Sequence, residues 1–106
     1  MTTTTQRPAT AMKNEIKRYL KRWTLDGDVH WYSKSAWRAR GEPYGNEADV
    51  SLTFEGPLYE ALNYGEWGGF REGGAVDFFA ETARKYGYFF EQGYAWSGHF
   101  YSEENV

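Results

Sequence analysis

The apolar content of this chain is mostly aromatic, and this limits how its core can be built. Phe, Tyr and Trp make up 20% of the 106 residues, whereas Ile, Leu and Val are scarce. Each aromatic side chain can bury about 150–250 Å², so a few rings replace many aliphatic side chains. The supply of rings exceeds what the core of so small a domain needs. We therefore expect some rings to be exposed and to form a contact surface.

The length of the chain predicts one domain. Residues 1–9 are polar and include Pro8, so we expect a flexible N-terminal tail followed by a single α+β domain over residues 10–106. The first ten residues lack the apolar stretch of a signal peptide, and no apolar run has the roughly 18 residues that a membrane span requires. These observations predict a soluble cytoplasmic protein without membrane contacts.

Apolar residues after Thr10 recur with the period of an α-helix. Thr10 has the side chain of a helix N-cap. The apolar residues that follow predict one buried helix face, formed by Met12, Ile16, Tyr19, Leu20 and Trp23. Basic residues occupy most of the remaining helix surface.

Two segments favour β-strands. Val29–Arg40 is rich in β-forming residues and ends before a Gly-Glu-Pro break, so we predict one strand, with Trp37 on the face toward the core. Asp49–Glu55 alternates more regularly between apolar and polar residues. It predicts a second strand whose inward residues are Val50, Leu52 and Phe54.

Two further helices are predicted after these strands. Pro57 suits the first position of a short helix, which Gly65 is placed to end. The segment 75–87 has an apolar face, with Asp77 near its start and Arg84 and Lys85 near its end, as the helix dipole favours. Between them, residues 65–74 contain five glycines and predict an irregular connection.

The stretch Tyr88–Tyr101 carries aromatic rings on both of its alternating faces. It predicts a strand with a bulge at Gly93, or a hairpin that bends there. Beyond Gly93, alternation places Tyr94, Trp96 and Phe100 on one side, which we expect to face the core. His99 and Tyr101 lie on the other side and are expected to be at least partly exposed.

Together these elements predict a small single-domain α+β fold with an antiparallel sheet of three to four strands. Two main helices and one short helix are expected to pack mostly on one face of the sheet. The predicted order is α-β-β-α-α-β, with no internal repeat and no second domain.

The charge of −3 is divided unevenly along the chain. Residues 1–40 hold nine basic and three acidic side chains, whereas residues 41–106 hold three basic and twelve acidic ones. The two halves can attract each other within the fold, or each can attract a partner. The basic half suggests a nucleic-acid-binding surface as one alternative function. Its candidate residues are Lys17, Lys21, Arg22, Tyr32, Lys34 and Arg38.

Several kinds of chemistry have little support. The chain has no cysteine, which excludes disulfides, thiolate metal sites and cysteine nucleophiles. No serine lies in a G-x-S-x-G motif, and His30 and His99 belong to no spaced metal-ligand motif. The glycine-rich segment matches neither a dinucleotide fingerprint nor a P-loop. We therefore expect no catalytic residue, metal or cofactor, and a small enzyme ranks third among the hypotheses.

The leading hypothesis is a non-enzymatic protein-binding domain that regulates or inhibits a larger protein or complex by occupying its surface. Trp67, Phe70 and Arg71 lie among glycines, and Trp and Arg are enriched at binding hot spots. With His99 and Tyr101 they form the predicted contact patch. An acidic second half also suits a basic groove on a partner. The oligomeric state stays open.

Overall fold

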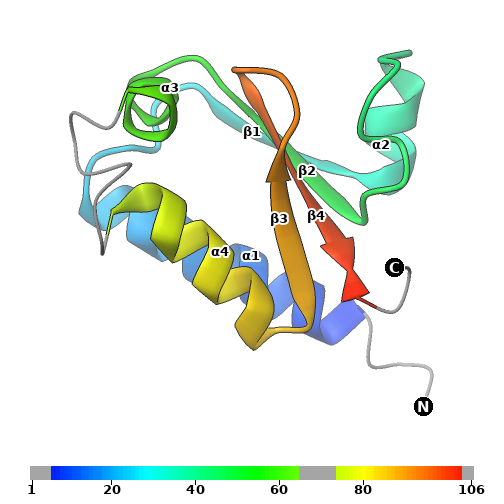
Figure 1. Ribbon diagram of the computed structural model, residues 1–106, viewed down its shortest axis with the longest axis horizontal. Coiled ribbons are helices and arrows are strands. Elements are labelled where there is room, and N and C mark those ends of the chain that lie inside the picture. The colour runs from blue at the N-terminus through cyan, green and yellow to red at the C-terminus, as the bar shows by residue number, and fades with distance from the viewer. Residues whose placement is uncertain (1–5, 65–73, 104–106) are drawn as a thin grey trace.

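The computed structural model describes residues 6–64 and 74–103 of the chain. The fold class predicted from the sequence is confirmed, because helices pack on a four-stranded antiparallel sheet. Figure 1 shows the order of the elements. They are α1 (Gln6–Arg22), β1 (Val29–Ser33), α2 (Lys34–Ala39), β2 (Val50–Phe54), α3 (Pro57–Asn63), α4 (Ala75–Lys85), β3 (Tyr88–Gln92) and β4 (Ser97–Ser102).

The strands are ordered β1-β2-β4-β3, so β2 and β4 lie in the middle of the sheet. All neighbouring strands are antiparallel. Leu52 of β2 is opposite Trp31 of β1 and Gly98 of β4. This register aligns the inward residues of the two central strands in one apolar layer.

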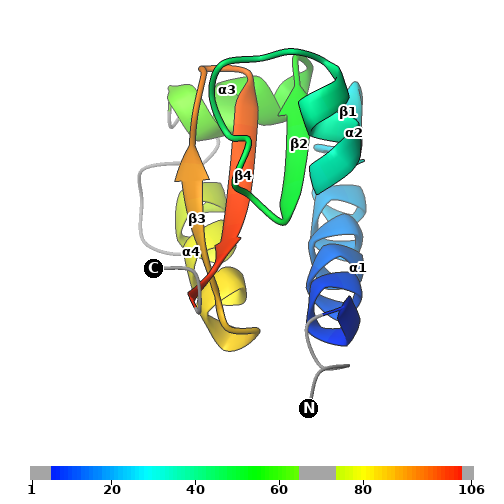
Figure 2. The same cartoon turned by 90° about the vertical axis from the view of Figure 1, so that its right-hand side faces the viewer.

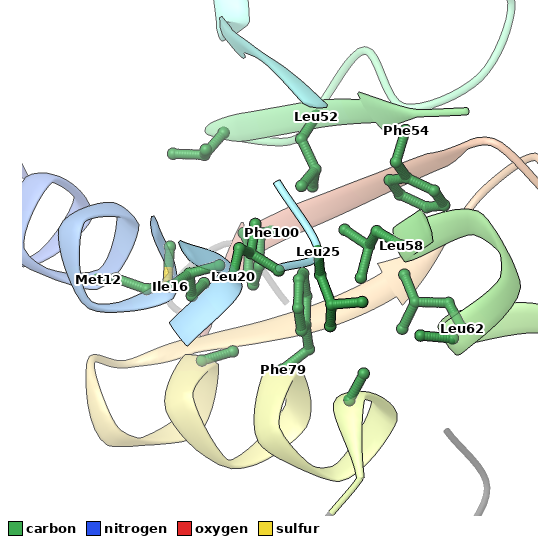
Figure 3. Close-up of a cluster of buried hydrophobic side chains, with 14 of the residues drawn as sticks. Met12, Ile16, Leu20, Leu25, Leu52, Phe54, Leu58, Leu62, Phe79 and Phe100 are labelled. Atoms are coloured by element: carbon green, nitrogen blue, oxygen red, sulfur yellow. The ribbon is translucent and has the colours of Figure 1, made fainter. Parts of the chain in front are cut away.

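The main core lies between the inner face of the sheet and the helices α1, α3 and α4. Val50, Leu52 and Phe54 are all buried, as their alternation predicted. Figure 3 shows the side chains that meet them from the helices and from β4. These include Met12, Ile16, Leu20, Leu58, Leu62, Phe79 and Phe100. The buried part of the core is thus mostly aliphatic and includes the rings of Phe54, Phe79, Tyr88 and Phe100.

Helix α1 begins four residues earlier than its predicted N-cap at Thr10. Residues 6–9, which were assigned to the tail, are helical. Pro8 is compatible with this because it falls in the first turn, where a backbone N–H would have no intrahelical partner. Trp23 was predicted to lie on the buried face, and this is wrong. It follows the last helical residue, is 60% exposed, and precedes Thr24, whose φ of 56° turns the chain away.

The predicted strand Val29–Arg40 is half strand and half helix. β1 ends at Ser33, whose hydroxyl accepts a hydrogen bond from the backbone N–H of Ala36 at 3.2 Å and so caps α2. The change to a helix removes Trp37 from the alternation of β1. Trp37 is fully buried, but against the face of the sheet opposite the main core. Figures 1 and 2 show α2 on the far side of the sheet from α4.

The last segment is a hairpin, which confirms the second of the two predicted alternatives and not the bulged strand. Its turn is closed by backbone hydrogen bonds from Gly93 N–H to Ser97 C=O and from Ser97 N–H to Tyr94 C=O. Because Tyr94 and Trp96 lie in this turn, their predicted place in the core is wrong. Phe100, in contrast, is buried in the core as expected.

The short helix at Pro57 and the helix over Ala75–Lys85 are both confirmed. Within the described part of the chain, none of the helices has the length and apolar character needed to cross a membrane.

Candidate binding face

The second face of the sheet, here called the outer face, faces away from α1, α3 and α4. Alternation directs one set of strand side chains to it, and α2 and the loop at residues 40–49 cover part of it. The set consists of His30, Tyr32, Ser51, Thr53, Phe89, Glu91, Ser97, His99 and Tyr101. Most of these side chains are polar or aromatic, unlike those of the inner face.

His99 is at the centre of the outer face and is fully buried. Its Nδ1 lies 2.9 Å from Ser51 Oγ and its Nε2 lies 3.0 Å from Ser97 Oγ. A neutral imidazole has one donor and one acceptor nitrogen, and the two hydroxyls can complement either tautomer. Burial lowers the pKa of His99 to about 4, so the ring is neutral at physiological pH. The prediction that His99 is partly exposed is therefore wrong.

Two glycines allow the chain to close over His99. A Cβ at Gly45 would collide with the ring, and a Cβ at Gly93 would lie 2.7 Å from its Nε2. Gly45 also has a φ of +85°, which side chains rarely tolerate. The loop carrying Gly45 and the turn carrying Gly93 are thus fixed against the same ring.

Trp37 covers His99 from α2. The two rings meet edge to face, with centroids 4.9 Å apart, and Trp37 Nε1–H donates to Tyr44 C=O at 2.8 Å. Through this bond the helix holds the loop that follows it. Trp37, like His99, has no exposed surface and serves the fold of the outer face rather than contact with a partner.

Arg40 lies among three aromatic rings on this face. Its Cζ is 5.1 Å from the ring centroids of Tyr32 and Trp37 and 5.8 Å from that of Trp96. The guanidinium also donates to Tyr32 Oη at 2.9 Å and to Glu42 Oε2 at 3.1 Å. These contacts combine cation–π attraction with an ion pair and hold the guanidinium in one place.

A pocket of about 400 Å³ opens beside Arg40. Its walls come from four separate parts of the chain: the beginning of β1, the end of α2, the end of β2 and the β3–β4 turn. The residues that line it are Asp28, His30, Tyr32, Arg40, Glu42, Thr53, Glu55 and Trp96.

At the other end of the outer face, aromatic rings and carboxylates are interspersed. Phe89 stacks on Tyr101 with centroids 5.2 Å apart, and Phe89 is 37% exposed. Burial, with the nearby Tyr44, Glu91 and Glu47, raises the pKa of Tyr101 to about 12. Burial and a hydrogen bond to Glu91 also raise the pKa of Tyr44. Both phenols therefore stay protonated at neutral pH and can donate hydrogen bonds.

A line of ring contacts runs from Tyr44 to the pocket. Tyr44 meets Tyr94 edge to face at 6.0 Å, and Tyr94 stacks on Trp96 at 4.6 Å. Trp96 in turn borders the pocket. Tyr44 is 37% exposed, and Tyr94 and Trp96 are partly buried, so this line of rings reaches the surface.

Comparison with protein-family models, with curated proteins and with solved structures finds no match to this chain. The function must therefore be argued from the residues of the outer face themselves.

The predicted contact patch is only partly within the described residues. Trp67, Phe70 and Arg71 lie outside them. Tyr101 is on the outer face and half-buried, where it stacks on Phe89. His99 shares that face but is enclosed, so it supports the surface without belonging to it.

The six candidate nucleic-acid contacts fall into different surroundings. Lys17, Lys21 and Arg22 are exposed on α1. In contrast, Lys34 lies 3.5 Å from Asp49 and Arg38 lies 3.5 Å from Glu47, so each already has a carboxylate partner. Both also border a second pocket of about 600 Å³. The hydroxyl of Tyr32 accepts a hydrogen bond from the guanidinium of Arg40.

Sequence patterns identified Tyr32 as a candidate contact but missed most of the pocket. Arg40 was placed in a strand, Trp96 was placed in the core, and Asp28 and Glu55 had no pattern around them. Only the register that puts Val29 opposite Phe54 makes their flanking residues Asp28 and Glu55 neighbours. Among the described residues no group of three or more His, Asp or Glu side chains is arranged to hold a metal ion.

Proposed function

We propose that this protein is a small non-enzymatic protein-binding domain that regulates or blocks a larger partner, and that the outer face is its contact surface. One observation carries the proposal: aromatic rings line that face from Phe89 to the pocket at Arg40, with carboxylates at both ends. Large rings bury much area while losing few rotors, which makes them frequent hot spots of protein interfaces.

The charges on the outer face favour a basic partner. Glu47 and Glu91 flank the rings at one end, and Asp28 and Glu55 flank the pocket at the other. The basic side chains nearby, Arg38 and Arg40, already pair with Glu47 and Glu42, whereas Glu91, Asp28 and Glu55 form no ion pair with another described residue. A partner surface rich in lysine or arginine therefore complements this face, and attraction between the two would accelerate their encounter.

The outer face is also preorganised for binding. His99, Ser51 and Ser97 connect β2 and β4 beneath it, and Gly45 packs directly on the imidazole. A surface that is already ordered loses less conformational entropy when a partner binds. This favours recognition by a rigid face over recognition by a segment that folds on contact.

The test compares two double variants as baits for extract from the native host, with captured proteins quantified by mass spectrometry. Phe89→Ser with Glu91→Lys changes exposed outer-face residues and should lose the partner. Lys17→Gln with Lys21→Gln changes exposed residues of α1 and should retain it. Equal capture by both baits, with both variants folded by circular dichroism, would contradict the proposal.

A nucleic-acid-binding domain is the second candidate. It is favoured by Lys17, Lys21 and Arg22, which are exposed on α1 and form no ion pair with another described residue. If α1 binds phosphate backbones, the Lys17→Gln, Lys21→Gln variant should bind random duplex more weakly and with a shallower salt dependence. We expect no meaningful binding by the wild type at physiological salt. Tight binding there would reverse the ranking.

A further inference from the structure

We propose that the pocket beside Arg40 binds one cationic side chain, a lysine ammonium or an arginine guanidinium, presented by the partner. This inference deepens the proposed function and rests on it, because the partner supplies the cation. Three features of the pocket favour a cation: two carboxylates that form no ion pair with another described residue, one nearly buried hydroxyl, and an arginine that is already paired with a carboxylate.

The two carboxylates are Asp28 and Glu55. Asp28 precedes β1 and Glu55 follows β2, and the Glu55 N–H donates to Asp28 C=O at 3.4 Å. Both side chains line the pocket, and neither forms an ion pair with another described residue. A cation in the pocket would be attracted by both carboxylates.

The hydroxyl belongs to Thr53, on the central strand β2. Thr53 is only 8% exposed, lines the pocket, and makes no side-chain hydrogen bond with another described residue. Its outer-face neighbours Ser51 and Ser97, in contrast, both bond to His99. No fully buried side-chain polar atom in the described part of the chain lacks a partner, so the Thr53 hydroxyl is reached from the pocket. It offers an acceptor to a ligand there.

The charges that line the pocket favour a cationic ligand, because the arginine among them, Arg40, is already paired. Its guanidinium is already paired with Glu42 and with the Tyr32 hydroxyl. Three carboxylates and one guanidinium then line the pocket, and its free groups include the acceptors Asp28, Glu55 and Thr53. Ammonium and guanidinium groups carry hydrogen-bond donors and no acceptors, so they complement this set. An anionic ligand would meet excess negative charge.

The pocket is large enough to admit the side chain of a lysine or arginine. Its volume of about 400 Å³ is near the lower end of the range for small-ligand pockets, which is about 300–1,000 Å³. Tyr32 and Trp96 supply apolar surface for the aliphatic stem of a lysine or arginine.

The first experiment uses small probes and the full chain, without any partner. Nα-acetyl-lysine amide, Nα-acetyl-arginine amide and the neutral Nα-acetyl-norleucine amide are titrated while amide and indole NMR signals are followed. The cationic probes should shift the signals of His30, Thr53 and the Trp96 indole with dissociation constants on the order of 1 mM, typical of one side chain. Whichever of the lysine and arginine probes binds with the lower dissociation constant shows whether the pocket prefers an ammonium or a guanidinium group. Equal shifts by the neutral probe would overturn the proposal.

The second experiment removes the acceptors. The double variant Asp28→Asn, Glu55→Gln should lower the affinity for the cationic probe at least about tenfold. Asn is chosen at position 28 because the φ there is 57°, a value that Asn tolerates. Thr53→Val should weaken binding severalfold. The control Glu60→Gln removes an exposed carboxylate of α3 and should change nothing. Unchanged affinity of the double variant for the cationic probe would overturn the proposal that the pocket binds a cation.

The two proposals fail separately. If the partner is captured through Phe89 and Glu91 but the Asp28→Asn, Glu55→Gln variant captures it equally well, the pocket proposal is wrong and the proposed function stands. If the Phe89→Ser, Glu91→Lys variant captures the partner as well as the Lys17→Gln, Lys21→Gln variant does, the proposed function is wrong, whatever the small probes show.

Discussion

The two faces of the sheet hold their helices by different means. The inner face is apolar, and Leu52, Phe54 and Phe79 are buried there among side chains from three helices. The outer face holds one six-residue helix through a network of hydrogen bonds and ring contacts centred on His99 and Trp37. Apolar packing tolerates many arrangements of similar volume, whereas the outer face depends on individual atoms. We therefore expect the inner face to contribute most of the stability and the outer face to be the more sensitive to changes of single atoms.

The largest expected effect tests the inner face. Phe79→Ala removes a ring that contacts Phe90 and Phe100 in the core, at centroid distances of 5.0 and 6.1 Å. We expect the free energy of unfolding to fall by about 3–5 kcal/mol, measured by urea denaturation. Phe89→Ala, on the outer face, should cost less than about 1 kcal/mol because that ring is 37% exposed. Similar losses for both would abolish the contrast between the faces.

A pair of glycine variants tests how closely the outer face is packed. Gly45 and Gly41 have similar positive φ values, +85° and +81°, so each Ala variant carries a strain of about 1–2 kcal/mol. Only Gly45→Ala also forces a Cβ into His99, which should add about 1–3 kcal/mol. Thermal unfolding of the two variants measures this difference. Equal melting temperatures would mean that the loop moves away from His99 without cost.

The pH dependence of stability tests the neutral state of His99. Its pKa is about 4 when folded, against about 6.5 when unfolded, so the unfolded chain binds more protons between these values. Stability should therefore fall as the pH falls from 6.5 to 4, with a contribution of at most about 1.4 kcal/mol per pH unit. His99→Gln should remove this contribution, while His30→Gln should keep it. A His99→Gln variant with the wild-type slope would show that His99 is not the group responsible.

The smallest effect concerns the guanidinium of Arg40. Arg40→Lys keeps the charge but loses the planar fork that bonds Tyr32 and Glu42 and lies over the rings. We expect a loss of about 0.5–1 kcal/mol in unfolding free energy. Arg38→Lys is the matched control, because Arg38 is half-exposed and should change stability by less than about 0.5 kcal/mol. A larger loss at Arg38 than at Arg40 would contradict the role given to the ring cluster.

The sequence alone identified the inner-face residues of β2 and most of the buried face of α1. The alternation over Val50–Phe54 and the helical spacing of Met12, Ile16 and Leu20 identified core residues correctly, because burial on one face imposes a period of two or about 3.6 on the residues themselves. The helices at Pro57 and Ala75 were also found, since their start signals are local.

Only the tertiary structure decided the outer face. The predicted strand ends at Ser33, where α2 begins, and Trp37 of this helix packs on His99 of the outer face. The turn at residues 93–96 likewise interrupts an alternation that continues in the sequence. The pocket then joins Asp28, Arg40, Glu55 and Trp96, which share no pattern along the chain. Their proximity follows from strand register and turn position, which depend on contacts between distant segments and leave no local period to detect.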